Sequence, residues 1–356
     1  MLRLMSTTAI ILGMAATAHA EELNVMSWGG AYTASQVEAY QKPFAAKTGA
    51  KINSIDADNP ATPIKAQVTA GNVSIDVATV LATDAARLCD EGLLEVLDLR
   101  GLPAAPDGTS ADKDFIPGAL TDCSVASDVY SWVIAYDETK VKGVSSVADF
   151  FDLTKFPGKR ALPKGAQGAL EFALVADGVP SADVYKVLAT DEGVTRAFKK
   201  LDTIKAQTIW WEAGAQPPQL LADGEVAMAV AFNGRIFNAA VAEGKPFKIL
   251  WDGQIMDLDV FVIPKGAPHR DAAWEYVKFA TGTQPLADAT KWISYGPTRK
   301  SSLPLVSTFN DGKTEMASHL PTAADNLKNA VLADPAFWTD HGTELNDRFN
   351  VWLASK

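Results

Sequence analysis

Strands and helices alternate along the first part of the chain. The predicted strands are residues 23–27, 51–55 and 75–80, and the helices that follow them are residues 33–48, 63–70 and 83–91. Strands that alternate with helices form parallel βαβ units. In such sheets, ligands bind outside the carboxyl ends of the strands. The alternation therefore predicts an α/β fold and the edge of the sheet at which a binding site would lie.

A second alternating region follows a loop rich in Gly, Pro and Asp at residues 101–117. An apolar run at 131–137 is predicted to be a strand that passes between two lobes. Further strands are predicted at 160–162, 208–211 and 226–231, and helices at 147–151, 170–176, 181–188, 195–201, 217–223 and 270–280. We expect lobe 1 to comprise residues 21–135 and 260–302. Lobe 2 is expected to comprise residues 136–259 and 303–356.

The N-terminus has the pattern of a secretory signal peptide. Arg3 precedes an apolar segment at about 8–16, and Ala18-His19-Ala20 is a small-residue cleavage signal. We expect residues 1–20 to be removed after Ala20 and the protein to be periplasmic, with full secretion left open. The formal charge of −11, without a block of Lys or Arg, disfavours nucleic acid as a partner.

The chain has two cysteines, Cys89 and Cys123. In an oxidising compartment we expect them to form a disulfide, the alternative being two buried thiols. The closed loop would add roughly 3–4 kcal/mol to stability. With three scattered histidines beyond the signal segment (His269, His319 and His341), the sequence predicts no metal site and no cofactor.

Carboxylates gather at residues 251–266. Asp257 and Asp259 precede a β-branched and aromatic run at 260–263, which predicts a short buried strand with acidic residues at its entrance. Side chains two residues apart on a strand point to the same side. This arrangement would suit a small cation, and the alternative is that the aspartates are solvated strand-end residues.

Other aromatic and polar side chains stand at the ends of predicted strands. Because the strand ends meet at one edge, we expect these side chains to share a cleft. They are Trp28 and Tyr32 around a Gly-Gly turn, Asp84 after the third strand, Trp211, and Phe232 with Arg235 in the sequence FNGR.

Four segments together resemble the periplasmic solute-binding proteins of ABC importers, and in particular the polyamine (spermidine/putrescine) binding family. They are SWGGAY (27–32), VAMAVAFNGR (226–235), DGQIMDLDVFVIPKGAP (252–268) and ISYGPT (293–298). The resemblance covers essentially the whole chain beyond residue 20. It implies two α/β lobes joined by hinge strands, an interlobe cleft that closes on its ligand, and delivery to an ABC permease in the inner membrane. We expect the protein to be monomeric.

The resemblance also implies roles for individual residues. Trp28 and Phe232 match aromatic side chains of the family's cleft, Asp259 matches the carboxylate that holds an ammonium, and Tyr295 matches a cleft tyrosine. A ring face near a desolvated ammonium is worth about 0.5–2 kcal/mol. For Phe232 and Tyr295 the alternative role is core packing.

Three departures from the polyamine pattern bear on the ligand. Residues 162–168 contain Lys164 and no carboxylate, Asp257 replaces a tryptophan, and Arg235 follows the Asn-Gly pair. An arginine can grip a carboxylate with its planar fork. Putrescine or spermidine is the main expectation, and a zwitterionic ω-amino acid such as 4-aminobutyrate is the alternative. Arg235 could instead face solvent or pair with Asp257 or Asp259.

Catalytic motifs such as HExxH, GxSxG or a P-loop do not occur in the sequence. We therefore expect a binding protein and not an enzyme. The alternative from another class is a secreted hydrolase that uses Asp257 and Asp259 as its acid and base. A metal-import protein is disfavoured, because only those two carboxylates approach a metal-ligand set.

Overall fold

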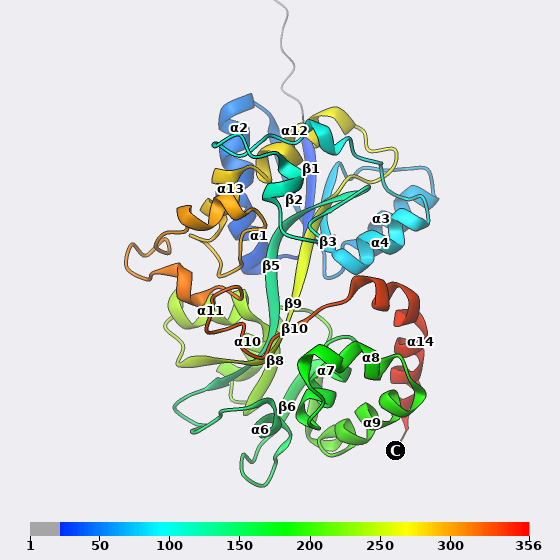
Figure 1. Cartoon of the computed structure of the whole chain (residues 1–356), viewed down its shortest axis with the longest axis vertical. Coiled ribbons are helices and arrows are strands. Elements are labelled where there is room, and N and C mark those ends of the chain that lie inside the picture. Colours follow the sequence, from blue (N-terminus) through cyan, green and yellow to red (C-terminus); the bar gives the residue numbers. More distant parts are fainter. Residues whose placement is uncertain (1–21, 356) are drawn as a thin grey trace, which may run out of the picture.

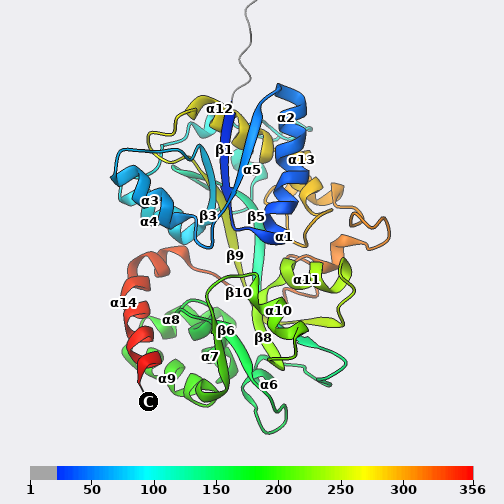
Figure 2. The same cartoon turned by 180° about the vertical axis from the view of Figure 1, so that it is seen from behind.

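The computed structural model describes residues 22–355, in which ten strands form one continuous sheet. The strand order is β2-β1-β3-β9-β5-β8-β6-β7, with β10 paired to β9 and β4 to β5. Figures 1 and 2 show two lobes, one above the other, with β5 and β9 running through both. The predicted signal peptide and its cleavage after Ala20 lie outside the described residues.

The upper lobe contains the parallel strands β1, β2 and β3. Their bounds are β1 Glu22–Ser27, β2 Lys51–Asp56 and β3 Val77–Leu81. The helices around them are α1 Gly30–Gln36, the π-helical turn η1 Val37–Gln41, α2 Lys42–Thr48, α3 Ala61–Thr69, α4 Ala82–Asp90, α5 Ala111–Asp114, α12 Arg270–Ala280 and α13 Thr283–Ala289. Its buried apolar side chains form a core of their own.

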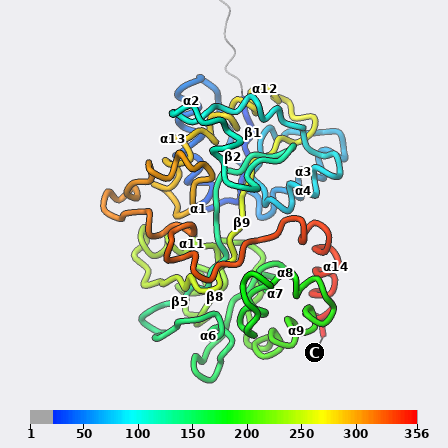
Figure 3. Tube along the Cα trace, viewed as in Figure 1, coloured from blue at the N-terminus to red at the C-terminus, as the bar shows by residue number. Residues whose placement is uncertain are grey.

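The lower lobe contains β6, β7 and β8 and has a separate core. The strands are β6 Arg160–Pro163, β7 Thr208–Trp211 and β8 Met228–Phe232. The helices are α6 Val147–Phe151, α7 Ala169–Ala176, α8 Val184–Leu188, α9 Asp191–Asp202, α10 Gln216–Ala222, α11 Asn233–Val241 and α14 Pro335–Ala354. In Figure 3 the orange-to-red tract leaves the upper lobe after α13, and the chain ends beside the lower lobe.

Two long antiparallel strands, β5 (Ser124–Asp137) and β9 (Phe247–Val262), connect the lobes. Their register shifts between Ala126 and Asp128 of β5, and again between Trp132 and Ile134. Such bulges bend a strand and increase its twist. The shorter elements are β4 Leu120–Thr121, β10 Val331–Leu332, and the 3₁₀ turns η2 Leu99–Gly101, η3 Ser181–Asp183, η4 Lys205–Gln207, η5 Lys300–Leu305 and η6 Met316–His319.

The α/β architecture with two lobes is confirmed, and two local predictions were wrong. Asp257 and Asp259 lie inside the 16-residue strand β9 and not at the entrance of a short strand. Phe232 ends β8, but Asn233, Gly234 and Arg235 begin the helix α11, which the sequence pattern did not indicate. The lobe boundaries at 135 and 259 stay a prediction, since both fall within continuous strands. No helix within residues 22–355 is both long and apolar enough to cross a membrane.

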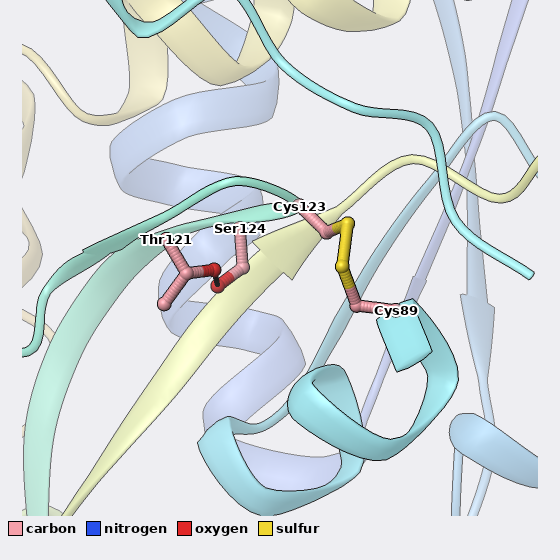
Figure 4. The surroundings of a disulfide bond; sticks show 4 residues. All are labelled: Cys89, Thr121, Cys123 and Ser124. Carbon is pink, nitrogen blue, oxygen red and sulfur yellow. Dashed lines mark hydrogen bonds between the residues drawn. A yellow bond between two sulfur atoms is a disulfide. The ribbon is translucent and has the colours of Figure 1, made fainter. Parts of the chain in front are cut away.

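The predicted disulfide joins Cys89 and Cys123, whose Cα atoms are 6.0 Å apart. Figure 4 shows that it links the end of α4 to the residue just before β5. Beside it, the hydroxyl oxygens of Thr121 and Ser124 are 2.7 Å apart across the turn between β4 and β5. The bond therefore fixes a peripheral helix of the upper lobe to the start of the strand that crosses to the lower lobe.

We predict that the double substitution Cys89→Ser and Cys123→Ser lowers the free energy of unfolding by about 3–4 kcal/mol. The reason is the loop of 34 residues that the bond closes in the unfolded chain. Urea unfolding of both proteins measures the difference. The wild-type protein under reducing conditions should match the double variant, and a difference below about 1 kcal/mol would contradict the prediction.

Candidate ligand-binding cleft

A cavity of about 880 Å³ lies where the two lobes meet. Its walls come from the strand ends β1, β3, β6, β7 and β8, the central strands β5 and β9, and the loop after α13. Of the predicted site residues, Trp28, Tyr32, Asp84, Trp211, Phe232, Arg235, Asp259 and Tyr295 line it. Asp257 does not reach the surface of the cavity and lies behind Tyr130. The structure thus brings the predicted residues into one place, and their roles in binding stay a prediction.

Two carboxylates lie opposite each other on the central strands, and of these two Asp259 lines the cavity whereas Asp128 lies behind its wall. Asp128 of β5 and Asp259 of β9 are direct partners in the antiparallel register, and Tyr130 is paired with Asp257 in the same way. All three aspartates are at most 6% exposed. None of the three forms an ion pair with a Lys, Arg or His among residues 22–355. Like charges directly opposite on neighbouring strands destabilise a sheet, so the pair Asp128 and Asp259 does not stabilise the fold.

Hydroxyl groups partly satisfy these carboxylates. The Tyr32 hydroxyl donates to Asp128 Oδ2 at 2.8 Å, and the Ser127 hydroxyl donates to the same oxygen at 2.9 Å. The Tyr130 hydroxyl donates to Asp257 Oδ2 at 3.1 Å. Oδ1 of Asp128 and Oδ1 of Asp259 are both buried without a hydrogen-bond partner from the protein.

Burial changes the acidity of all three groups. It raises the pKa of Asp128 to about 7, although hydrogen bonds from Tyr32 and Ser127 oppose the rise. It raises the pKa of Asp257 to about 6, against hydrogen bonds from the Leu258 N–H and the Tyr130 hydroxyl. Burial, together with the charges of Asp128 and Asp257, raises the pKa of Asp259 well above its ordinary value. A cationic partner in the cleft would reverse these shifts.

A row of aromatic rings lines the cleft from one lobe to the other. Ring centroids are 5.6 Å apart for Tyr32 and Tyr295, 6.0 Å for Tyr295 and Tyr130, and 5.5 Å for Tyr130 and Phe232. The row continues through Trp132, 4.5 Å from Phe232, to Trp211, which stacks on Trp132 at 5.9 Å. These rings pack on one another and also present surface to the cavity. Phe232 and Tyr295 therefore pack against neighbouring rings and line the cavity at the same time.

Arg235 lies on the cleft wall and is 7% exposed, so it does not face solvent. Its Nη1 donates to the Gly29 carbonyl at 3.2 Å, and its Nη2 donates to the Trp28 carbonyl at 3.0 Å. Its Nε is buried without a partner, and among residues 22–355 it forms no ion pair with a carboxylate. The glycine turn allows this approach, because a Cβ at Gly30 would lie 2.9 Å from Nη1.

Two charged residues of the wall already have partners. Asp84 pairs with Arg87 on the same helix at 2.6 Å, and Lys164 pairs with Glu212 at 2.6 Å near the surface. Both pairs are partly exposed, so solvent screens them. Of the two basic residues in the described cleft wall, Lys164 and Arg235, only Arg235 has no acidic partner.

Several residues in or directly behind the cleft wall were not predicted from the sequence. Asp128 and Tyr130 lie before the apolar run at 131–137, so the strand was started too late. Asp128, Tyr130 and Trp132 alternate along β5, and this period of two would have placed them on one face. Gln167 follows no strand or helix signal, yet its Nε2 donates to Asp257 at 3.3 Å.

Residues 39–322 match the family described as bacterial extracellular solute-binding protein. The chain belongs to this family. It is 44% identical to a gamma-aminobutyric acid-binding protein of Pseudomonas aeruginosa over 98% of this chain and 96% of that protein. It is also 23% identical to the putrescine-binding periplasmic protein PotF of Escherichia coli, over 82% of this chain and 81% of PotF.

Solved structures show the same architecture. A binding protein from Agrobacterium tumefaciens B6 in complex with glucopine has a TM-score of 0.84 and 30% identity, covering 93% of this chain and 99% of that one. A GABA receptor has a TM-score of 0.79 and 34% identity, covering 94% and 98%. The chain is therefore the substrate-binding component of an ABC transporter and not an enzyme, and Asp257 and Asp259 are not a hydrolase pair.

Within residues 22–355, no three His, Cys, Asp or Glu side chains are placed to hold a metal ion. Asp257 and Asp259 alone are too few for the oxygen-ligand sets that hard cations prefer. The acidic base of the cleft, flanked by rings, is suited instead to an organic cation.

We predict that Asp128→Asn stabilises the ligand-free protein, and by more at pH 8 than at pH 5. The pKa of Asp128 is raised to about 7 on folding, so the folded state holds the extra proton between about pH 4 and 7. The stability that this group contributes falls as pH rises through that window. Asparagine keeps an acceptor for Tyr32 and removes the buried charge.

Thermal unfolding of both proteins at the two pH values measures this effect. The matched control is Asp271→Asn, because that side chain is 97% exposed and its change should be small at both values. A change in melting temperature for Asp128→Asn that is equal at pH 5 and pH 8 would contradict the assignment.

Proposed function

We propose that the protein captures a zwitterionic ω-amino acid, such as 4-aminobutyrate, in the periplasm and delivers it to the membrane permease of its ABC importer. The observation that carries this proposal is the presence, in one cavity, of a buried carboxylate without a cation, Asp259, and a buried arginine without an acidic partner, Arg235. A ligand with one ammonium and one carboxylate complements both.

The ammonium end would lie between Asp259 and the aromatic rings. Asp259 has a buried Oδ1 without a partner, and the indole N–H of Trp28 nearby is also without one. Charge-assisted hydrogen bonds to a carboxylate are short and strong, and ring faces add cation–π attraction. Trp28, Tyr32 and Tyr295 supply rings on this side of the cavity.

The carboxylate end would lie against Arg235. Its guanidinium carries five N–H groups, and the Trp28 and Gly29 carbonyls take two of them. The unpartnered Nε–H and the second hydrogens of the Nη atoms remain for a ligand. The two carbonyls also hold the guanidinium in place, which limits the rotamer entropy that binding would otherwise remove.

A diamine is disfavoured by the same geometry. Its second ammonium would require a carboxylate at the far end of the cavity. The charged groups that the lower lobe places there are Lys164, Arg235 and Glu212, and Glu212 is already paired with Lys164. Like charges in a partly buried site repel each other. The 44% identity to a gamma-aminobutyric acid-binding protein, against 23% to PotF, supports the same choice.

Capture would proceed by a shift in lobe arrangement. Asp259 lies where β9 pairs with β3 of the upper lobe, and Trp28 directly follows β1 of the same lobe. Arg235, Phe232 and Trp211 belong to elements of the lower lobe. A ligand that contacts both sets favours the closed arrangement by its difference in affinity for the two states. The permease would then recognise the closed form.

Calorimetric titration of ligand-stripped protein with 4-aminobutyrate, putrescine and spermidine tests the proposal. We expect 4-aminobutyrate to bind at least about tenfold more tightly than either polyamine, a difference of about 1.4 kcal/mol. Tighter binding of putrescine or spermidine would overturn the choice of ligand while leaving the transport role unchanged.

We further predict that Arg235→Gln weakens 4-aminobutyrate binding by about 10- to 100-fold, because it removes charge-assisted hydrogen bonds worth about 1.5–3 kcal/mol. The matched control is Lys164→Gln, which removes another basic residue of the cavity that is already paired with Glu212. Its effect should be smaller than threefold. An equal loss in the two variants would contradict the role of Arg235.

A further inference from the structure

We propose that Asp128, which is paired with Asp259 behind the cavity wall, shares one proton with Asp259 when the cleft holds no ligand, and that the ligand's ammonium at Asp259 displaces this proton. The inference rests on the proposed function for the class of ligand, and it adds a residue and a proton to the site. Transport would then depend on the pH of the compartment in which the protein binds its ligand.

The register of β5 and β9 carries the argument. Asp128 and Asp259 are paired directly across the two antiparallel strands, an arrangement that places Cβ atoms about 4.5–5.5 Å apart. The side chains are 6% and 5% exposed, so water screens their repulsion poorly. Two ionised carboxylates at this separation and burial cannot coexist without a cation, and one shared proton removes the conflict.

The hydrogen-bond pattern agrees with a shared proton. Tyr32 and Ser127 both donate to Oδ2 of Asp128, which leaves the other oxygen for a different partner. That oxygen, Oδ1 of Asp128, and Oδ1 of Asp259 are both buried and both without a partner. A proton on one of these oxygens would make it a donor to the other, and an ammonium beside Asp259 would replace the positive charge of that proton.

Other titratable groups surround the pair without neutralising it. They are Tyr32 and Tyr40 on the helical segment after β1, Tyr130 on β5, Asp257 on β9, Tyr295 in the loop after α13, and Arg235 on α11. Burial raises the pKa of each tyrosine above its ordinary value, so these hydroxyls stay neutral donors. Asp257 adds further negative charge, and Arg235 is bound to backbone carbonyls.

The exchange can be written as a balanced step. An R–NH₃⁺ group enters, the O–H bond of the protonated pair breaks, the proton passes to solvent, and the ammonium donates hydrogen bonds to Asp259 while both carboxylates are ionised. Both ends of 4-aminobutyrate keep their charge between about pH 5.5 and 8, because amines and carboxylic acids of this kind titrate near 10 and 4. Any pH dependence of binding in this range therefore belongs to the protein.

The test is calorimetric titration in phosphate and in Tris, two buffers that differ in ionisation enthalpy, between pH 5.5 and 8. At pH 7 we expect release of about half a proton or more per ligand, since burial places the pKa of Asp128 at about 7. Affinity should fall by up to about tenfold per pH unit on acidification. Equal binding enthalpies in the two buffers would overturn the inference.

Two variants separate the pair from other groups. Asp128→Asn should reduce the proton release and shift the pH dependence to lower pH, because it removes the charge of Asp128, which adds to burial in raising the pKa of Asp259. Asp271→Asn, which changes a carboxylate that is 97% exposed, should release as many protons as the wild type. Proton release that persists unchanged in Asp128→Asn would assign the proton to Asp257 or to Asp259 alone and overturn the role of Asp128.

The same titrations with putrescine keep this inference distinct from the choice of ligand. If putrescine binds and 4-aminobutyrate does not, the zwitterion proposal fails. Proton release on putrescine binding would still test whether Asp128 and Asp259 share a proton. A second experiment uses no ligand: NMR follows the carboxyl ¹³C resonances of Asp128 and Asp259 from pH 4 to 9. We expect one step near neutral pH, and two titrations complete below pH 5 would refute the shared proton.

Discussion

Two buried aspartates that oppose each other across β5 and β9 are the constraint on which the cleft depends. Such a pair costs stability, because each carboxylate loses hydration and each repels the other. The surrounding residues reduce this cost without removing it: hydroxyls donate to Asp128, and no lysine or arginine of the described chain pairs with either group. A site that is left incomplete in this way is suited to a ligand that supplies the missing charge.

Much of the fold follows from local signals in the sequence. Short runs with a strand pattern alternate with helical patterns, and alternation of this kind admits few arrangements. The carboxyl ends of strands then bring Trp28, Asp84 and Phe232 to one cavity, although they are far apart in sequence. Asp259 is found by the same reasoning, because it precedes the most apolar part of β9.

The remaining features depend on contacts that leave no mark in a local pattern. β9 was taken to be short because Gly253 and three aspartates interrupt its apolar residues, whereas pairing with β5 along almost its whole length keeps it extended. Asp128 was missed for the converse reason, since a polar residue before an apolar run suggests a loop. The partners of Arg235 are backbone carbonyls, which no side-chain motif can announce.

The bulges in the central strands have a mechanical consequence. One lies at Ser127 of β5, and the other lies where Gly253 of β9 adopts a φ of +64°. Together they bracket the segment that carries Asp128, Tyr130, Asp257 and Asp259. Because the sheet is continuous, rotation of one lobe against the other must be absorbed by these strands and by the tract before α14. The hinge and the floor of the binding site are thus the same piece of chain, so a substitution that alters its stiffness changes interlobe angle and ligand affinity together.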